Sequence, residues 1–385
     1  MGCSRPPPDT LTVAMSLSES EWKVFREEVF YRFEQISGVR VNGYQVESGQ
    51  LATKLEALQA AGRSEIDVFA QDNMNLAALV NKGLVEDLSP YESDIPKSIL
   101  PNLTSSCKFN GKLMFMPFRP NVQIVYYNKA AFKRYGIEPP QSWNELLEAA
   151  KKFKQEEGVG RVLLKAYGGN PTATQVYEFI LQAGGDPYAF DDEGCVTAFR
   201  FLRTLGPYIS PESKRAKWDT TNEILARKEA YIAQNWPFGV VILVKEYGLS
   251  DIGTYSGFHG PAGEQHVIGG DVFGIPVTSK HKHLARIFIQ FIQTKGIQEL
   301  LVSKLGWPSA RSDAYGEVEP WLRPHFDAVN EALRHGRFRE QITWWPAYEK
   351  YVNEAFREIV LEGADVEKTL SRYKGMLEKE KARFE

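Results

Sequence analysis

The chain of 385 residues has no long apolar run and almost no excess of charge. No stretch approaches the roughly 18 to 20 apolar residues that a membrane span requires. The formal net charge is −3, so nothing indicates nucleic-acid binding. There are three cysteines; Cys107 and Cys195 could pair, but nothing in the sequence decides this. Hydrophobic residues make up 43% of the chain, which is ordinary for a globular protein, and the length allows two domains.

Signatures of many enzyme classes are also missing. The chain contains no P-loop, HExxH, GxSxG or CxxC motif, and no Ser-His-Asp or Cys-His set stands out. His281 and His283 are interpreted as a surface pair rather than as metal ligands. A glycosidase needs two facing carboxylates, which Glu19, Asp72 and Asp271 could supply in principle. The sequence therefore predicts no cofactor, no metal and no enzyme activity, with a glycoside-processing enzyme left open as an alternative.

The first third of the chain alternates strands and helices. Strands are expected over 11–15, 39–46 and 66–70, and helices over 19–37, 51–61 and 73–82. Ser18 and Glu21 fit a capping box before the first helix. This alternation is typical of an α/β protein with a parallel sheet. Ligands of such sheets bind beyond the carboxyl ends of strands, so the loops at 16–19, 48–50 and 71–73 are candidate site loops.

The stretch MPFRPNVQIVYYNK at 116–129 begins with polar, irregular residues and continues as an apolar strand. Pro117 and Pro120 lack a backbone donor and do not fit a central strand. We therefore expect the chain to leave one sheet and enter another here, with Arg119 and Asn121 between two lobes. The alternative is a polar turn before an ordinary strand.

Other segments continue the pattern. They are PQSWNELLEAA at 140–150, QNWPF at 234–238, Gly269-Gly270 with Ile275-Pro276 and Ser279-Lys280, and GWPSAR at 306–311. In this order, together with 111–129, they resemble the extracellular solute-binding proteins of bacterial carbohydrate ABC transporters. That family includes the maltose- and trehalose/maltose-binding proteins. The resemblance runs from Leu11 to about Leu377.

The resemblance implies an α/β fold of the two-lobe periplasmic-binding-protein type. Two α/β domains would be joined by hinge crossings and would close on a ligand in the cleft between them. The implied division is a tether over 1–10, lobe 1 over 11–118 and 270–314, and lobe 2 over 119–269 and 315–385.

The resemblance also implies which positions face the ligand. Trp236 and Phe238 match an aromatic pair on which pyranose rings stack, although either could be core. Asp72 matches a carboxylate that holds sugar hydroxyls, although an Asp before a helix is also a good N-cap. Arg119 and Asn121 stand where trehalose/maltose binders carry an aromatic and an acid, which leaves the sugar in question. The full set is Glu19, Gln50, Asp72, Arg119, Asn121, Tyr167, Trp236, Phe238, Gly270, Asp271, Trp307, Arg339 and Trp345.

The beginning of the chain resembles the processing site of a bacterial lipoprotein. Cys3 follows a glycine and precedes a short proline-rich tether, although no apolar signal segment comes before it. In this interpretation Cys3 carries a lipid, and the protein is periplasmic or extracytoplasmic and anchored to the cell envelope. The alternative is an N-terminus with an incidental cysteine.

The predicted function is that of a monomeric, non-enzymatic substrate-binding protein of an ABC importer. It would capture a mono- or disaccharide and deliver it to permease subunits in the membrane. By resemblance the sugar is an α-linked glucose disaccharide of the maltose, trehalose or sucrose type. Binding of another solute, such as a polyamine, a metal chelate or glycerol phosphate, is the further alternative. Arg119 and Arg339 keep glycerol phosphate open, because phosphate binders favour basic groups.

Overall fold

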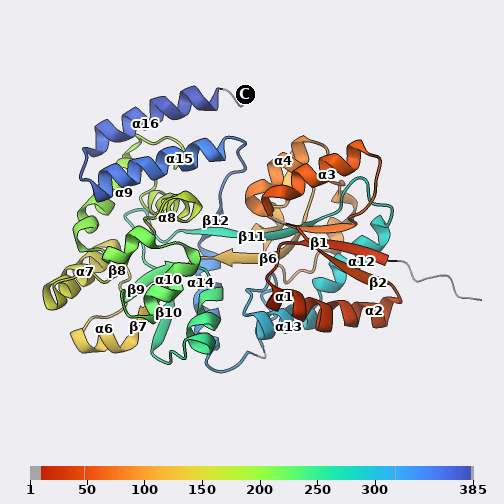
Figure 1. Ribbon diagram of the computed structural model, residues 1–385, viewed down its shortest axis with the longest axis horizontal. Helices are drawn as coiled ribbons and strands as arrows, with labels where there is room; N and C mark the ends of the chain where they lie inside the picture. Colours follow the sequence, from red (N-terminus) through yellow and green to blue (C-terminus); the bar gives the residue numbers. More distant parts are fainter. Residues whose placement is uncertain (1–9, 47, 317, 383–385) are drawn as a thin grey trace, which may run out of the picture. The chain divides into compact units, whose positions relative to one another are not determined.

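The structure is a computed structural model that describes residues 10–46, 48–316 and 318–382 (Figure 1). The predicted lipidation site at Cys3 lies outside the described residues. The strands are β1 (Thr10–Met15), β2 (Arg40–Gln45), β3 (Val68–Asp72), β4 (Lys108–Phe109), β5 (Lys112–Leu113), β6 (Met116–Val122), β7 (Ile124–Asn128), β8 (Val162–Leu163), β9 (Ile232–Asn235), β10 (Ile252–Tyr255), β11 (His266–Gly274) and β12 (Gly336–Phe338).

The α-helices are α1 (Glu19–Val24), α2 (Tyr31–Ser37), α3 (Leu51–Ala60), α4 (Leu76–Asn81), α5 (Pro101–Ser105), α6 (Lys129–Tyr135), α7 (Trp143–Glu157), α8 (Gly169–Gln182), α9 (Glu193–Leu205), α10 (Trp218–Ala226), α11 (Phe238–Val241), α12 (Lys282–Ile292), α13 (Lys295–Leu305), α14 (Arg323–Arg334), α15 (Trp345–Phe356) and α16 (Val366–Lys381). None of the helices within the described ranges is long and apolar enough to cross a membrane.

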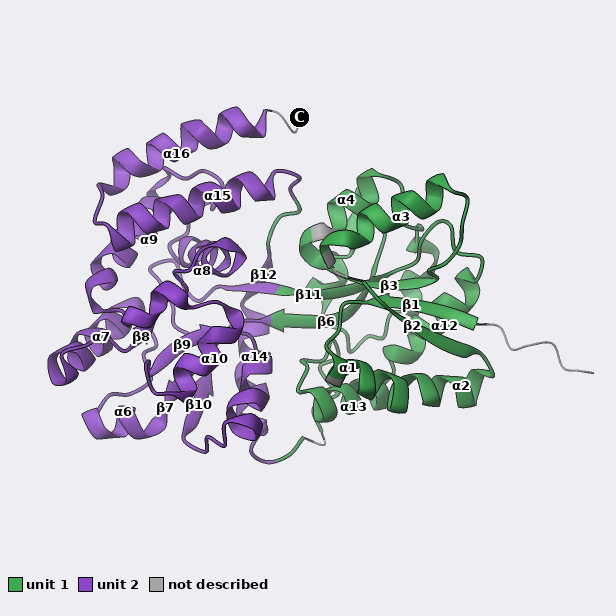
Figure 2. Ribbon diagram, viewed as in Figure 1, with its two compact units in different colours: residues 1–121, 269–319, 339–341 green, residues 122–268, 320–338, 342–385 purple. Residues whose placement is uncertain are grey.

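The chain divides into two compact units (Figure 2). Unit 1 holds the residues up to 121 with 269–319 and 339–341, and unit 2 holds 122–268, 320–338 and 342–385. The change of unit along β6 falls between Asn121 and Val122. The boundaries differ from the expected ones at 119–121, 269, 315–319 and 339–341, all of which belong to unit 1. Cys107 and Cys195 are both free and buried, and they belong to different units.

Unit 1 is built on a sheet with three parallel strands, as its alternating pattern predicts. β1 pairs in parallel with β2 and with β3. β11 then adds to β3 in the antiparallel sense, and this pairing sets Asp271 opposite Asp72. The third strand was expected over 66–70 but covers Val68–Asp72, so that Asp72 ends the strand instead of following it.

The first helix begins as the sequence predicts. The backbone N–H of Glu21 donates to Ser18 Oγ at 3.4 Å, and the N–H of Ser18 donates to Glu21 Oε2 at 2.8 Å, which completes the capping box. A π-helical turn over Phe25–Phe30 continues α1 into α2. The run ends at Gly38, whose φ of 71° allows the left-handed C-cap. Its buried side is Trp22, Phe25, Val29, Phe30 and Phe33.

The proline-marked stretch forms strand β6, and the chain changes unit along it, as expected for a crossing strand. β6 includes both Pro117 and Pro120, and it pairs with β11 outside the main path of the sheet. A strand at such a position tolerates residues that cannot donate to a second neighbour. The apolar strand expected next is β7, which begins at Ile124.

Unit 2 contains a four-stranded sheet in the order β10-β7-β9-β8. Helix α7 begins at the expected cap, where the N–H of Glu145 donates to Ser142 Oγ at 3.3 Å. The second half of the predicted capping box is not formed, because Glu145 Oε2 accepts from the N–H of Gln141 at 2.7 Å instead.

Two predicted site residues of unit 2 lie in helices rather than in a strand or a loop. β9 ends at Asn235, and Phe238 begins α11. Pro237 causes the change, because it has no backbone N–H for a strand ladder and its φ of −58° suits a helix start. Trp345 was expected in a loop but is the first residue of α15.

Candidate functional site

A group of charged side chains in unit 1 surrounds Arg119 on β6. Its Nη2 donates to Asp271 Oδ2 on β11, and its Nη1 lies 3.5 Å from Glu21 Oε1. The guanidinium carbon lies 4.0 Å from the centre of the Trp307 ring. The side chain of Arg119 is only 23% exposed. Partial burial strengthens both the ion pairs and the cation–π contact, so the guanidinium is held in one orientation.

Trp307 is a fixed surface beneath that guanidinium. Its Nε1 donates to Glu21 Oε1 at 3.0 Å. Its ring contacts Phe25 and Phe118 at centroid distances of 5.8 and 5.9 Å. Trp307 is buried, so it supports Arg119 and belongs to the core on its other side.

Glu21 was not among the predicted site residues, whereas Glu19 was. The Glu19 side chain is 89% exposed and lies 3.7 Å from Arg26. Glu21 reaches Arg119 because the capping box fixes its carboxylate in the first turn of α1. The capping signal could therefore have indicated Glu21 as the residue with a defined position.

Asp72 has the capping role that the sequence offered as one of its two interpretations. Its Oδ1 accepts from the N–H of Met74 at 2.9 Å and caps the 3₁₀ turn Asn73–Asn75. Burial, followed by the charge of Asp271, raises the pKa of Asp72 to about 6, against the opposing charges of Arg339 and Arg119. A carboxyl group in this position changes charge in mildly acidic solution.

Arg339 joins these residues from a distant part of the chain. It is 4% exposed and belongs to the short segment 339–341 of unit 1. Gln341 Oε1 in the same segment accepts from the N–H of Ala77 at 3.2 Å. We call Glu21, Asp72, Arg119, Asp271, Trp307 and Arg339 the Arg119 cluster. It combines three carboxylates with two guanidinium groups.

Gly270 permits the close approach of β6 and β11 at this cluster. Its φ is 114°, and a Cβ built there would lie 2.1 Å from the carbonyl oxygen of Arg119 and 2.9 Å from the backbone nitrogen of Asn121. Only glycine fits both constraints. The backbone at this position thus sets where Arg119 and the partly buried Asn121 lie.

In unit 2 the predicted Trp236 follows directly after β9. Trp236 is 8% exposed, and its carbonyl accepts from the hydroxyl of Tyr126 at 2.7 Å. Its ring centre is 5.1 Å from that of Trp218, with the planes inclined by 50°. Trp218 was missed by sequence reasoning. It begins α10, and nothing in its local pattern separates it from a core tryptophan.

The remaining predicted residues lie in different surroundings. Tyr167 is 59% exposed, and Lys217 Nζ lies 3.6 Å above its ring. Trp345 is buried, and its Nε1 donates to Glu349 Oε2 at 3.2 Å within α15. Phe238 is partly buried, and Gln50 is exposed at the end of a 3₁₀ turn.

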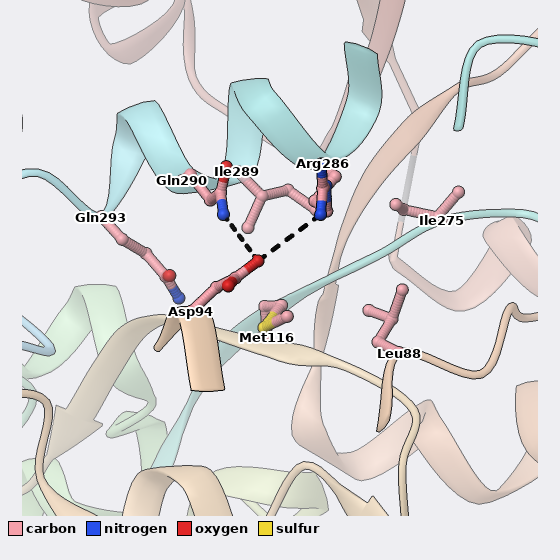
Figure 3. Close-up of a pocket in the computed structure, with 8 residues that line it drawn as sticks. All are labelled: Leu88, Asp94, Met116, Ile275, Arg286, Ile289, Gln290 and Gln293. Atoms are coloured by element: carbon pink, nitrogen blue, oxygen red, sulfur yellow. Dashed lines mark hydrogen bonds and ion pairs between the residues drawn. The ribbon is translucent and has the colours of Figure 1, made fainter. Parts of the chain in front are cut away.

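Two cavities contain none of the predicted site residues. The first, in unit 1, has a volume of about 10 Å³, which is room for one water molecule (Figure 3). Asp94 beside it accepts from Gln290 Nε2 at 2.8 Å and lies 3.6 Å from Arg286 Nη1. The second, of about 480 Å³, lies in unit 2 between Pro211–Arg215 and Arg357–Leu361. Among the described residues, no group of three or more His, Cys, Asp or Glu side chains could hold a metal ion.

Comparison with known proteins identifies the family. The model of bacterial extracellular solute-binding proteins matches residues 28–328, well over half of the chain. The chain belongs to this family. The matched family and the relatives below are binding proteins rather than enzymes.

Curated relatives have different named solutes. A probable amino-acid ABC transporter periplasmic-binding protein of Sinorhizobium fredii is 25% identical over 223 residues, covering 54% of this chain and 50% of its own length. The sn-glycerol-3-phosphate-binding periplasmic protein of Brucella abortus is 27% identical over 273 residues, covering 63% and 59%. This chain thus spans only half to three-fifths of these relatives, and the family alone does not choose the solute.

The fold is that of the two-lobe solute-binding proteins. A maltose-bound MalE3 structure of T. maritima superposes with a TM-score of 0.80 at 19% identity, covering 96% of this chain and 99% of that one. The predicted fold class is confirmed by this likeness. At this level of identity the superposition is evidence for the fold and not for the solute.

Proposed function

We propose that this protein is the substrate-binding component of an ABC importer and that its solute is a sugar, specifically an α-linked glucose disaccharide. The observation that carries the proposal is the Arg119 cluster, a fixed set of hydrogen-bond donors and acceptors. Trp236, paired with Trp218, supplies the other kind of contact that a sugar needs. Maltose is included among the probes below because a protein of the same fold has been described with maltose bound.

The Arg119 cluster suits hydroxyl groups because it contains donors and acceptors side by side. A hydroxyl accepts one hydrogen bond and donates another, whereas guanidinium groups only donate and carboxylates only accept. A buried hydroxyl left unpaired costs about 1 to 3 kcal/mol. The juxtaposed Arg119 and Asp271 can satisfy both requirements of one hydroxyl.

The tryptophan pair suits the apolar face of a pyranose ring. Covering C–H surface contributes roughly 25 cal/mol per Å² removed from water. Flat rings also restrict the orientation of a sugar without needing a charge. An affinity near 1 μM needs about 8 kcal/mol, which stacking and several charge-assisted hydrogen bonds together can provide.

Glycerol phosphate is the second candidate, because Arg119 and Arg339 are both in the cluster and a relative carries that name. Against it, the cluster has three carboxylates for its two guanidinium groups. A doubly charged phosphate would meet an excess of negative charge unless Asp72 were protonated. We therefore place the neutral sugar first.

A thermal-shift and calorimetric screen of the intact protein tests the proposal. The probes are maltose, trehalose, sucrose, glucose and glycerol 3-phosphate. We expect stabilisation by a disaccharide at low micromolar concentration, since binding to the native state raises the melting temperature by mass action. Stabilisation by glycerol 3-phosphate alone would replace the sugar with the second candidate. Release of monosaccharide from the probes would restore the enzyme alternative.

A further inference from the structure

Lys165 is a buried cation of unit 2 that has no part in the site described above. The residue follows β8 and is 1% exposed. Its ammonium donates to Gln123 Oε1 at 3.0 Å and to the carbonyl oxygen of Gln234 at 2.5 Å. The same nitrogen lies 4.7 Å from the centre of the Trp218 ring. One charged group therefore contacts an amide, a strand end and an indole face.

The strand end that Lys165 contacts leads directly to Trp236. Gln234, Asn235 and Trp236 are consecutive. Asn235 Nδ2 donates to the carbonyl of Trp218 at 2.9 Å and to Asn222 Oδ1 at 2.8 Å. The end of β9 thus contacts Lys165 through Gln234. The next two residues contact Trp218, Asn235 at its backbone and Trp236 at its ring. Both tryptophans are tied to the same small network.

An ammonium group in this position is costly, which indicates that its contacts matter. Burial lowers the pKa of Lys165 to about 7, although the charge of Glu178 opposes the shift. Glu178 is held in turn by Gln234, whose Nε2 donates to its Oε1 at 2.6 Å. An apolar side chain of similar length would avoid the cost of removing a charge from water, but it could not donate a hydrogen bond to the Gln234 carbonyl.

We propose that Lys165 is a positioning residue that fixes Trp218 and Trp236 as one aromatic surface. Its ammonium orients the Trp218 ring through a cation–π contact and the Trp236 backbone through the end of β9. Trp218 thereby becomes a further ligand-contacting residue beside Trp236. This last role rests on the proposed function, whereas the geometric role of Lys165 does not.

The geometric role is testable by circular dichroism without any ligand. Two indole rings at this separation couple their electronic transitions and give a paired positive and negative band. The difference between the spectra of the wild type and Trp218→Phe isolates the band of this pair. We expect Lys165→Met to lose that band and Lys165→Arg, which keeps a cation, to retain part of it.

A matched control exists in the same unit. Lys154 Nζ also donates to a backbone carbonyl, that of Pro207 at 2.7 Å, and lies 5.6 Å from the Tyr208 ring centre. Lys154→Met removes the same two kinds of contact away from the tryptophan pair and should leave the band unchanged. A full band in folded Lys165→Met would overturn the proposal.

The wild type provides the same test if Lys165→Met does not fold. The side chains facing Lys165 are Gln175 and Glu178 of α8, Gln234 of β9, Gln123 before β7 and Trp218 of α10, and Glu178 is the ionisable one among them. The band should change as Lys165 loses its proton, with a midpoint of about pH 7. The proton on the Lys165 amine is followed in the same samples by NMR of the side-chain nitrogen, and a band that stays constant while that proton is lost contradicts the proposal.

Sugar affinity separates this inference from the proposed function. If both hold, Lys165→Met weakens calorimetric affinity by about three- to thirtyfold, and Lys154→Met does not. If the band is lost in Lys165→Met while the wild type binds none of the sugar probes, the proposed function fails and the positioning role stands. If the band persists while sugar binding is strong, the positioning role fails alone.

Discussion

The side chains of the Arg119 cluster in unit 1 and those of Trp218 and Trp236 in unit 2 are held in place by opposite arrangements of charge and aromatic ring. In unit 1 the guanidinium of Arg119 is partly exposed, and it lies against the aromatic ring of Trp307. In unit 2 the charge is buried, and it supports aromatic rings. Both units use a cation–π contact. In unit 1 the ring supports the cation, and in unit 2 the cation supports the ring.

A raised pKa favours the neutral form of an acid but the charged form of a base, and each unit provides an example. In unit 1 the pKa of Asp72 is raised, so its neutral form is favoured. In unit 2 burial lowers the pKa of His266, but hydrogen bonds and charges from Glu178 and Glu264 outweigh it and raise the pKa to about 9. His266 is therefore favoured in its charged form. The carboxyl group of Asp72 therefore changes charge in mildly acidic solution, whereas His266 keeps its charge at neutral pH, and the predictions below probe this contrast.

The largest effect is expected at Gly270, where the backbones of β6 and β11 meet. Gly270→Val should lower the free energy of unfolding by about 3 kcal/mol or more, because the side chain would overlap the Arg119 carbonyl. Gly263 of unit 2 is a matched control, since its φ of 111° is similar but nothing lies within 4 Å of its Cβ position. Urea denaturation of both variants measures the difference, and equal losses would show that φ alone matters.

Trp236 should dominate sugar binding from unit 2. Trp236→Ala is expected to weaken affinity by about 2 kcal/mol, roughly thirtyfold, because the stacking surface is lost. Tyr247→Ala in the same unit removes an exposed aromatic ring and serves as the control in calorimetry. Unchanged affinity in folded Trp236→Ala would remove this residue from the proposed site.

His266 should make the stability depend on pH. Its folded pKa of about 9 exceeds its ordinary value of 6.5, so its stabilisation is complete below pH 6.5 and is lost as the pH rises towards 9. The loss should be on the order of 3 kcal/mol and absent from His266→Gln. Lys165 acts oppositely above about pH 7, so the quantity to compare is the difference between wild-type and variant unfolding curves. Parallel curves for the two proteins would show that folding does not raise the pKa of His266.

Replacing Asp72 should have a smaller effect on each of two properties, the stability of the fold and the affinity for sugar. Asp72→Ala is expected to lose about 1 kcal/mol of stability with the cap and at least about 1 kcal/mol of sugar affinity. Asp365 caps α16 through the N–H of Lys368 at 2.9 Å, so Asp365→Ala should lose stability only. If the two variants bind sugar equally well, Asp72 has a capping role alone.

Sequence patterns within a few residues correctly predicted the features that depend only on nearby residues, such as helix caps and helix ends. The capping box of Ser18 and Glu21 and the helix end before Gly38 form as the sequence indicates, because each involves residues within one or two turns. The alternation of the first third likewise predicted the parallel strands of unit 1. Pro237 could have warned that the strand ends before Phe238.

Long-range arrangements were not predictable in this way. Arg119 and Asp271 are 152 residues apart, and the antiparallel register of β11 decides that they meet. The selection of Trp218 and Lys165 depends on how β9, α8 and α10 pack, which no local period encodes. The resemblance to known binders supplied positions such as Asp72 and Trp236 but not their surroundings. Glu21 was missed because the resemblance pointed to Glu19, although the predicted capping box had already given Glu21 a defined position.

The short segment around Arg339 has a consequence for how the protein is made. Synthesis runs from the N-terminus, and residues 339–341 are the last piece of unit 1 to be added. Until then Glu21, Asp72 and Asp271 have Arg119 as their guanidinium in the cluster. The cluster therefore reaches its final balance of charge only when nearly nine-tenths of the chain has been synthesised.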